Sequence, residues 1–168
     1  MTLYKELLLL RHGKSDWNTD TTDFNRPLNK RGERNAQQMA EWMEEQQLIP
    51  DLVISSPAVR ALTTAEIVCK TLDLAFDSLQ LDKCIYEASL PNLKQVLSQT
   101  SNSVHRLLLV GHNPGFEYLV RNLSPDIPMA KNGNLMPTAS LAYLQLDMQW
   151  STLYGQSWIQ RPKDLPSK

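Results

Sequence analysis

Cysteine is scarce in this 168-residue sequence, which contains only Cys69 and Cys84. Neither belongs to a CxxC pair, and no histidine stands at a spacing typical of a zinc site, so the sequence indicates neither a disulfide framework nor a structural metal. Cys69 falls on the apolar stripe of an expected helix. We therefore interpret both residues as reduced thiols in the core.

An excess of charge is also missing. Lysine and arginine number 17 against 18 aspartates and glutamates, which gives a formal net charge of -1 with neutral histidines. Such a balance provides no extended basic field of the kind that holds nucleic acid or an anionic membrane. Neither partner is expected, and any affinity for a phosphate group must come from a local cluster of cations.

Long apolar runs are absent as well. The leucine run at residues 7–10 follows no basic region and is too short for the core of a signal peptide or for a membrane span. We expect a cytoplasmic protein. With 42% hydrophobic residues the chain can bury a core of its own. We predict one domain over residues 1–160, followed by a frayed tail over residues 161–168 that carries two prolines.

Three short apolar runs share one design. They cover residues 7–10, 52–55 and 107–110, and continuous runs of this length are typical of strands buried on both faces of a parallel sheet. Helical patterns separate them, with apolar side chains on one face of each segment. The predicted helices cover residues 31–47, 57–72, 90–98 and 114–123. Strands that alternate with helices predict an α/β fold, layered around a mainly parallel sheet.

The end of the chain follows another pattern. Residues 140–146 alternate apolar and polar side chains, which predicts a half-buried strand, and residues 150–154 are the candidate for its edge partner. Residues 124–137 hold three prolines and show little periodicity, so we expect a loop there.

All three buried runs end in polar or reactive residues. The first is followed by Arg11, His12 and Gly13, the second ends in SSP at residues 55–57, and the third runs into GHNP at residues 111–114. Ligands of an open α/β sheet collect at the carboxyl ends of its strands. A polar residue followed by proline marks a helix N-terminus, and helix N-termini attract anions.

Arg60 adds a second guanidinium to this edge of the sheet. It lies off the apolar stripe of its helix and is free to lean over the strand ends. Together with Arg11, His12 and His112 it predicts a site for a phosphoryl group, because guanidinium groups match phosphate oxygens and a histidine can donate to them or attack phosphorus.

Three motifs resemble, in order and spacing, the signatures of the histidine phosphatase superfamily. They are RHGKSDWN from residue 11, SSPAVRALTTA from residue 55 and VGHNPG from residue 110. The small size is similar to that of the SixA-type phosphohistidine phosphatase branch. The resemblance extends over residues 7–140 and implies the phosphoglycerate-mutase-like fold, a three-layer α/β/α sandwich. It also implies a phosphatase that uses neither a metal nor another cofactor.

The resemblance implies a role for each matching residue. His12 would be the nucleophile, which receives the phosphoryl group as a phosphohistidine that water then hydrolyses. Arg11, Arg60 and His112 would form the phosphate pocket, and Glu87 would donate a proton to the leaving group. The candidate substrate-binding residues are Asn18, Ser15, Gly13 and Asn113.

The chemistry sets conditions on two of these residues. To attack phosphorus, His12 must be neutral with one ring nitrogen free. We predict that a backbone carbonyl holds its other N–H and that the neighbouring arginines lower its pKa. Glu87 needs a raised pKa to act as an acid near neutrality, whereas the arginines lower that pKa until phosphate cancels their charge. A phosphorylated imidazole leaves easily once it is protonated, so it depends less on this donor than an alkyl phosphate ester does.

Several interpretations stay open. Glu87 is also compatible with an ordinary surface residue, and Arg60, taken alone, with a solvated helix charge. The expected activity is hydrolysis of phosphohistidine in a phosphorylated protein, or else of a small phosphate ester. The alternative is a non-catalytic phosphate-binding module. A mutase is disfavoured, since mutase-type relatives carry a longer insertion that closes over a sugar phosphate and little chain is available between Glu87 and His105. The sequence does not indicate an oligomeric state.

Overall fold

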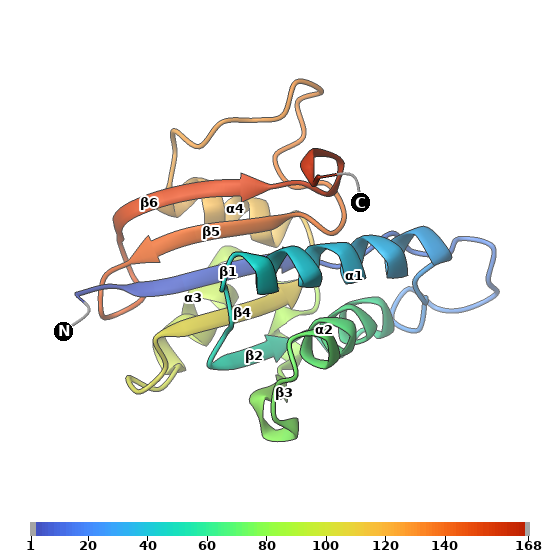
Figure 1. The fold of residues 1–168 in the computed structure, drawn as a ribbon, viewed down its shortest axis with the longest axis horizontal. Coiled ribbons are helices and arrows are strands. Elements are labelled where there is room, and N and C mark those ends of the chain that lie inside the picture. The colour runs from blue at the N-terminus through green and yellow to red at the C-terminus, as the bar shows by residue number, and fades with distance from the viewer. Residues whose placement is uncertain (1–2, 167–168) are drawn as a thin grey trace.

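The structure, a computed structural model, describes residues 3–166 and arranges them around a six-stranded sheet (Figure 1). The strands are β1 (Lys5–Arg11), β2 (Leu52–Ser55), β3 (Leu79–Leu81), β4 (Arg106–Gly111), β5 (Leu141–Leu146) and β6 (Leu153–Gln160). They lie in the order β3-β2-β4-β1-β5-β6. The first four in this order pair in parallel, whereas β5 and β6 extend the sheet in antiparallel fashion. The predicted α/β fold with a mainly parallel sheet is confirmed.

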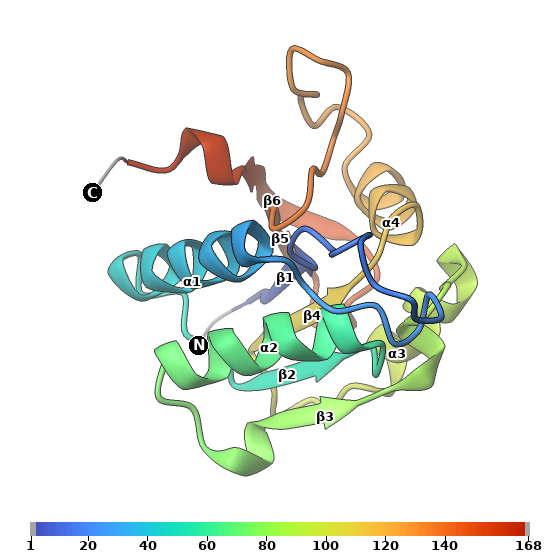
Figure 2. The ribbon, with the colours of Figure 1, turned by 90° about the vertical axis from the view of Figure 1, so that its right-hand side faces the viewer.

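Within residues 3–166, four α-helices cover the two faces of this sheet. They are α1 (Lys30–Glu45), α2 (Val59–Thr71), α3 (Leu90–Gln99) and α4 (Gly115–Leu123). α1 and α2 lie on one face, and α3 and α4 lie on the other, as Figure 2 shows. The predicted helices are confirmed, with ends within two residues of those observed. The fold is therefore the three-layer sandwich that the motifs imply.

The leucine run of β1 is continuous because helices cover the strand on both sides. Leu8 and Leu10 belong to the core cluster beneath α1 and α2, and Leu7 and Leu9 belong to the cluster beneath α3 and α4. All four side chains are fully buried. Successive side chains of a strand point to opposite faces, so an uninterrupted apolar run is what a strand between two helical layers requires.

A close backbone contact fixes the start of α1 against the end of β1. A Cβ atom on Gly13 would lie 2.5 Å from the carbonyl oxygen of Gly32, and one on Gly32 would collide with the backbone of Lys14. The side chain of Asn29 caps the helix by accepting a hydrogen bond from the Gly32 N–H at 2.8 Å. The loop between β1 and α1 is thereby held over the carboxyl ends of the strands.

The last two strands differ from the predictions. β5 is buried on both faces rather than half-buried, because Tyr143 stacks on Trp158 of β6 at 4.8 Å between ring centroids and is itself covered. β6 begins at Leu153, and Trp150 lies in the preceding turn, where it is buried. Residues 124–137 contain no helix or strand, as predicted for a loop.

The cysteines differ from the prediction made for them. Both cysteines are free, but Cys69 is only half-buried and Cys84 is exposed, so the prediction of two core thiols is wrong.

In the segment expected to fray, Pro162–Asp164 forms a single 3-10 turn and Arg161 donates hydrogen bonds to the carbonyl oxygens of Leu135 and Pro128. Residues 167–168 lie outside the described part of the chain.

No helix within residues 3–166 has both the length and the apolar character needed to cross a membrane.

Candidate active site

The sheet register brings the two site histidines together. β1 and β4 are neighbouring parallel strands, and Arg11 pairs with Gly111 at their carboxyl ends. The next residues, His12 and His112, therefore leave the sheet side by side. Their ring centroids lie 5.1 Å apart at an interplanar angle of 55°. The prediction that strand ends gather these residues at one edge of the sheet agrees with this placement.

Hydrogen bonds define the tautomer of His12. Its Nδ1 lies 2.7 Å from the carbonyl oxygen of Gly13, and its Nε2 lies 3.3 Å from Nε of Arg60. A carbonyl can only accept and a guanidinium can only donate, so Nδ1 carries the hydrogen and Nε2 presents its lone pair. The backbone carbonyl expected to hold the ring N–H is that of Gly13. His12 is thus oriented as a neutral base or nucleophile.

The pKa of His12 is lowered to about 3. Burial is the largest cause, since the side chain is only 7% exposed and a charged ring would lose its hydration. The hydrogen bond to Gly13 opposes this effect, and the charges of His112, Arg60 and Arg11 add to it. The predicted direction is confirmed, but burial contributes more than the arginines do.

Arg60 extends from the first turn of α2 to the ring of His12. Its other nitrogens bind Asp23 of the β1–α1 loop: Nη1 donates to the carbonyl oxygen at 2.5 Å, and Nη2 contacts the carboxylate at 3.0 Å. The Arg60 side chain is buried under this loop, which the helical pattern alone did not indicate. Thr64, one turn later in α2, accepts a hydrogen bond from the Gly13 N–H at 3.1 Å and so fixes the helix against the strand end.

His112 has one nitrogen engaged and one without a partner. Its Nε2 forms a 2.8 Å hydrogen bond with Oγ of Ser56, whereas its Nδ1 is buried with no hydrogen-bond partner in the described part of the chain. Burial and the charge of Arg60 lower the pKa of His112 to about 4. A buried polar atom left without a partner is costly, so Nδ1 is a natural contact for a bound polar ligand.

Arg11 and Asn113 show the same feature. Nη1 of Arg11 donates to the carbonyl oxygen of Met136 at 2.9 Å, while Nε is buried and unpartnered among residues 3–166. Burial lowers the pKa of Arg11, an effect that Glu117 opposes. The Asn113 amide donates to Glu117 and to Met136, and its Oδ1 is likewise buried without a partner in residues 3–166. The site therefore holds three unpaired polar atoms around two histidines.

A cavity of about 390 Å³ opens beside these residues. It is lined by Asp23, Arg60, Tyr86, Glu87, Ala88, His112, Asn113, Pro114 and Gly115. A larger hollow of about 520 Å³, whose lining includes Trp42 and Trp158, has no charged side chain in that lining, so it lacks the chemistry of an anion site. The charged cavity at the strand ends is the candidate active site.

The remaining predicted site residues fall into two groups. Glu87 is exposed and lines the cavity, and its role as proton donor stays a prediction. Gly13 is buried against Gly32 and serves backbone packing. Ser15 is buried and its carbonyl oxygen accepts a hydrogen bond from the side chain of Asn29. Asn18 is exposed in the loop, and the cavity lining does not include it.

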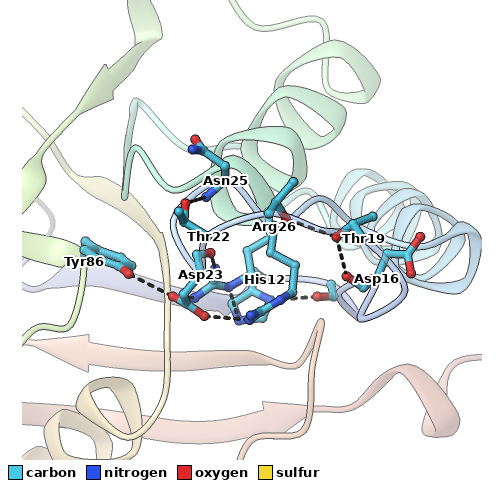
Figure 3. Close-up of polar contacts among 11 residues, drawn as sticks. His12, Asp16, Thr19, Thr22, Asp23, Asn25, Arg26 and Tyr86 are labelled. Atoms are coloured by element: carbon cyan, nitrogen blue, oxygen red, sulfur yellow. Dashed lines mark hydrogen bonds and ion pairs between the residues drawn. The ribbon is translucent and has the colours of Figure 1, made fainter.

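Sequence reasoning missed two residues of the cavity, Asp23 and Tyr86. Oδ2 of Asp23 accepts hydrogen bonds from Nη2 of Arg60 and from the Tyr86 hydroxyl at 2.8 Å, and Oδ1 pairs with Arg26 at 2.6 Å (Figure 3). Neither residue belongs to a regular pattern. The one available signal was Arg26, an arginine in the same loop that needs an acidic partner.

Among residues 3–166, no group of three or more histidine, cysteine, aspartate or glutamate side chains is placed to hold a metal ion.

Comparisons with known proteins agree with this geometry. Residues 7–106 match the family profile described as histidine phosphatase superfamily (branch 1). A 2,3-bisphosphoglycerate-dependent phosphoglycerate mutase of Bifidobacterium longum is 37% identical over 81 residues, which are 46% of this chain and 32% of the mutase. The match thus spans about a third of that relative's length.

Two solved structures resemble the whole fold. The structure of the protein histidine phosphatase SixA complexed with tungstate has a TM-score of 0.80 and 25% identity, with 96% of this chain and 99% of that chain covered. A SixA protein from Agrobacterium tumefaciens has a TM-score of 0.71 and 27% identity, with 84% of this chain and 92% of that chain covered.

Proposed function

Because the chain belongs to the histidine phosphatase superfamily, we propose that it is a phosphohistidine phosphatase that acts through a covalent intermediate on His12. The observation that carries the proposal is the state of that ring. Nδ1–H is held by the carbonyl oxygen of Gly13, so Nε2 presents a lone pair beside the guanidinium group of Arg60. A SixA protein histidine phosphatase with the same fold supports the choice of substrate class.

The first chemical step is attack of His12 Nε2 on phosphorus. The N–P bond forms as the bond from phosphorus to the leaving atom breaks, and the leaving atom takes the bonding electron pair together with a proton. Arg60, in contact with Nε2 before the reaction, lies where it can follow the phosphoryl oxygens. Guanidinium groups supply fixed positive charge to these oxygens, and fixed charge is what phosphoryl transfer chiefly needs.

The second step returns the enzyme to its starting state. Water attacks phosphorus and gives a proton to the carboxylate that Glu87 carries after the first step, or to solvent. The N–P bond breaks with its electrons returning to Nε2, and inorganic phosphate leaves. Nδ1 of His112 is a buried ring nitrogen next to His12 and can contact a phosphoryl oxygen in both steps. No step in this scheme routes charge through a metal ion.

The proton for the leaving group is the point at which substrates differ. Glu87 lines the cavity and is exposed, so it can reach a leaving atom there. A phosphohistidine that is protonated on its second ring nitrogen needs no such donor, whereas an alkyl phosphate ester does. The site therefore handles a phosphorylated imidazole with fewer demands on Glu87.

A protein substrate is compatible with the open side of the cavity. The segment between Glu87 and His105 contains α3, whose Leu93 and Leu97 are buried against the sheet face, and of this segment Ala88 alone lines the cavity. The phosphorylated side chain of a partner protein can then reach His12 from outside. A small phosphate ester is the other substrate class that such a cavity admits.

The decisive experiment measures hydrolysis of an aryl phosphate in the presence of a metal chelator. We expect turnover by the wild-type protein and loss of at least a thousandfold in kcat for His12→Ala. His105→Ala is the matched control, because His105 is exposed and lies outside the site. Activity that survives in His12→Ala would rule out the nucleophile, and tight phosphate binding without turnover would identify a binding module instead.

Substrate class needs a separate comparison. Phosphohistidine peptides, the other phosphoamino acids and small phosphate esters are assayed side by side, and we expect the highest kcat/KM for phosphohistidine. A higher kcat/KM for a small ester would contradict the assignment to phosphoproteins while leaving the role of His12 intact.

A further inference from the structure

Asp23 places a carboxylate inside a cavity that otherwise gathers cations. Its side chain lies between Tyr86 and His12 in Figure 3, where it receives hydrogen bonds from the Tyr86 hydroxyl and from Arg60. Partial burial acts to raise the pKa of Asp23, but these hydrogen bonds and that from Arg26 lower it to about 2. The group is therefore a full negative charge at neutral pH.

Besides its ion pair with the Asp23 carboxylate, Arg60 has contacts that do not depend on this charge. Nε of Arg60 contacts His12, and Nη1 donates to the carbonyl oxygen of Asp23, which any residue at that position supplies. The loop has further attachments, since the Val59 N–H donates to the carbonyl oxygen of Phe24 at 3.0 Å. A neutral side chain at position 23 leaves all three contacts available, so we look for a role of the carboxylate other than positioning Arg60.

The direction of attack places the leaving group next to this carboxylate. In-line transfer puts the leaving atom on the side of phosphorus opposite to His12 Nε2. His12 lies behind the cavity wall, where it contacts Arg60, and the cavity lining itself includes Asp23, Tyr86 and Glu87. A phosphoryl group bound between His12 and Arg60 would therefore have its leaving group in the cavity, next to Asp23 and Glu87.

We propose that Asp23 is a specificity-determining residue, whose carboxylate favours phosphoryl donors with a positively charged leaving group over donors with a carboxylate on the leaving group. Glu87, the candidate proton donor, lies on the same wall of the cavity. A protonated imidazole is a leaving group of the favoured kind, and a phosphorylated hydroxy acid is of the disfavoured kind. The inference rests on the proposed function, because the direction of attack from His12 defines where the leaving group lies.

The size of the effect follows from charge alone. Two ligands that share a phosphate group and differ by an ammonium in place of a carboxylate differ by two unit charges near Asp23. At about 6 Å in water, this difference in interaction with one carboxylate corresponds to roughly tenfold in relative affinity. Removing the Asp23 charge also strengthens binding of the phosphate group that both ligands share. This gain is the same for both ligands, so it cancels in the ratio of their two dissociation constants.

The test compares O-phosphoethanolamine and phosphoglycolate, which are alkyl phosphates of similar size. Calorimetric titration gives the Kd of each ligand for the wild-type protein, and we expect tighter binding of O-phosphoethanolamine. In Asp23→Asn, the ratio of the two Kd values shifts by about tenfold toward phosphoglycolate. Asp23→Glu keeps the charge and retains the wild-type preference.

Asp20→Asn is the matched control, because Asp20 lies in the same loop, is exposed and does not line the cavity. We expect it to leave the ratio unchanged. A ratio that is equal in wild type and Asp23→Asn overturns the proposal. Equal weakening of both ligands also overturns it, since Asp23 would then only position Arg60, and failure of both ligands to bind the wild-type protein overturns it as well.

Turnover is measured separately, so the two proposals can fail independently. Binding of these ligands requires no attack by His12. A shifted ratio in a protein that hydrolyses no aryl phosphate would refute the phosphatase while supporting the selectivity of Asp23. Normal turnover with an unshifted ratio would refute the selectivity alone.

Discussion

Acidification will destabilise the fold through His12 and His112. Their folded-state pKa values, about 3 and about 4, lie below the ordinary histidine value of 6.5. Between pH 6.5 and these values the unfolded chain binds protons at both positions and the folded protein does not, so stability falls as pH falls. At pH 5 each histidine costs about 2 kcal/mol relative to pH 7.5, and about 4 kcal/mol together.

Urea unfolding at pH 7.5 and pH 5.0 measures this loss. This pH range isolates the effect of the histidines. Asp23 also stabilises the fold through its lowered pKa, but that stabilisation is lost only below the ordinary aspartate pKa, which lies under pH 5. Replacing one histidine, as in His112→Asn, removes about half of the pH dependence. The double variant with His12→Asn removes most of it.

Two results would refute the reasoning. One is a wild-type protein that is equally stable at both pH values. The other is a double variant whose stability falls as steeply as that of the wild type, which would assign the effect to other groups. An NMR titration that finds the His12 ring charged well above pH 7 would contradict both the pKa and the nucleophilic role.

Three further predictions concern the catalytic acid, the phosphate pocket and the packing. Glu87→Gln lowers kcat for an alkyl phosphate by about 10²–10⁴-fold and for a phosphohistidine peptide by much less, and an equal loss for both substrates would contradict the role of Glu87 as proton donor. Arg60→Lys weakens inhibition by inorganic phosphate, and we expect Ki to rise at least tenfold. The reason is that a lysine ammonium cannot contact His12 and the phosphate oxygens at once, as a planar guanidinium can. An unchanged Ki would show that Arg60 does not contact phosphate. Gly32→Ala lowers the free energy of unfolding by roughly 1–3 kcal/mol in urea titrations, since its Cβ meets the Lys14 backbone. A variant as stable as the wild type would show that the backbone moves aside without cost.

The sequence predicts the centre of the fold better than its edges. β1, β2 and β4 lie between two helical layers, so their apolar runs are continuous and easy to recognise. β3 has three residues, two of them exposed, and no pattern marks it. The alternation in residues 140–146 predicts a half-buried strand, whereas Trp158 stacks on Tyr143 in the folded chain and helps to bury it. Contacts between distant segments decide such positions.

The same distinction applies to the site. Arg11, His12 and His112 follow directly from strand ends, because the parallel topology alone brings them together. Asp23 lies in an irregular loop, and its position depends on how that loop crosses the strand ends. Its partners Arg60 and Tyr86 are 37 and 63 residues away in sequence, and no local pattern encodes such contacts.

The proposed mechanism assigns the reaction to a neutral histidine and the positive charge to two arginines. Burial keeps His12 and His112 neutral, while Arg11 and Arg60 hold the positive charge. A protonated His12 could not attack phosphorus, so the stability lost in acid and the nucleophile available at neutral pH have the same physical origin. The unpaired Nδ1 of His112 and Nε of Arg11 cost stability in the free protein. In the proposed mechanism a bound oxyanion would give both atoms a partner, and we expect the binding energy recovered there to add to the affinity for the phosphoryl group.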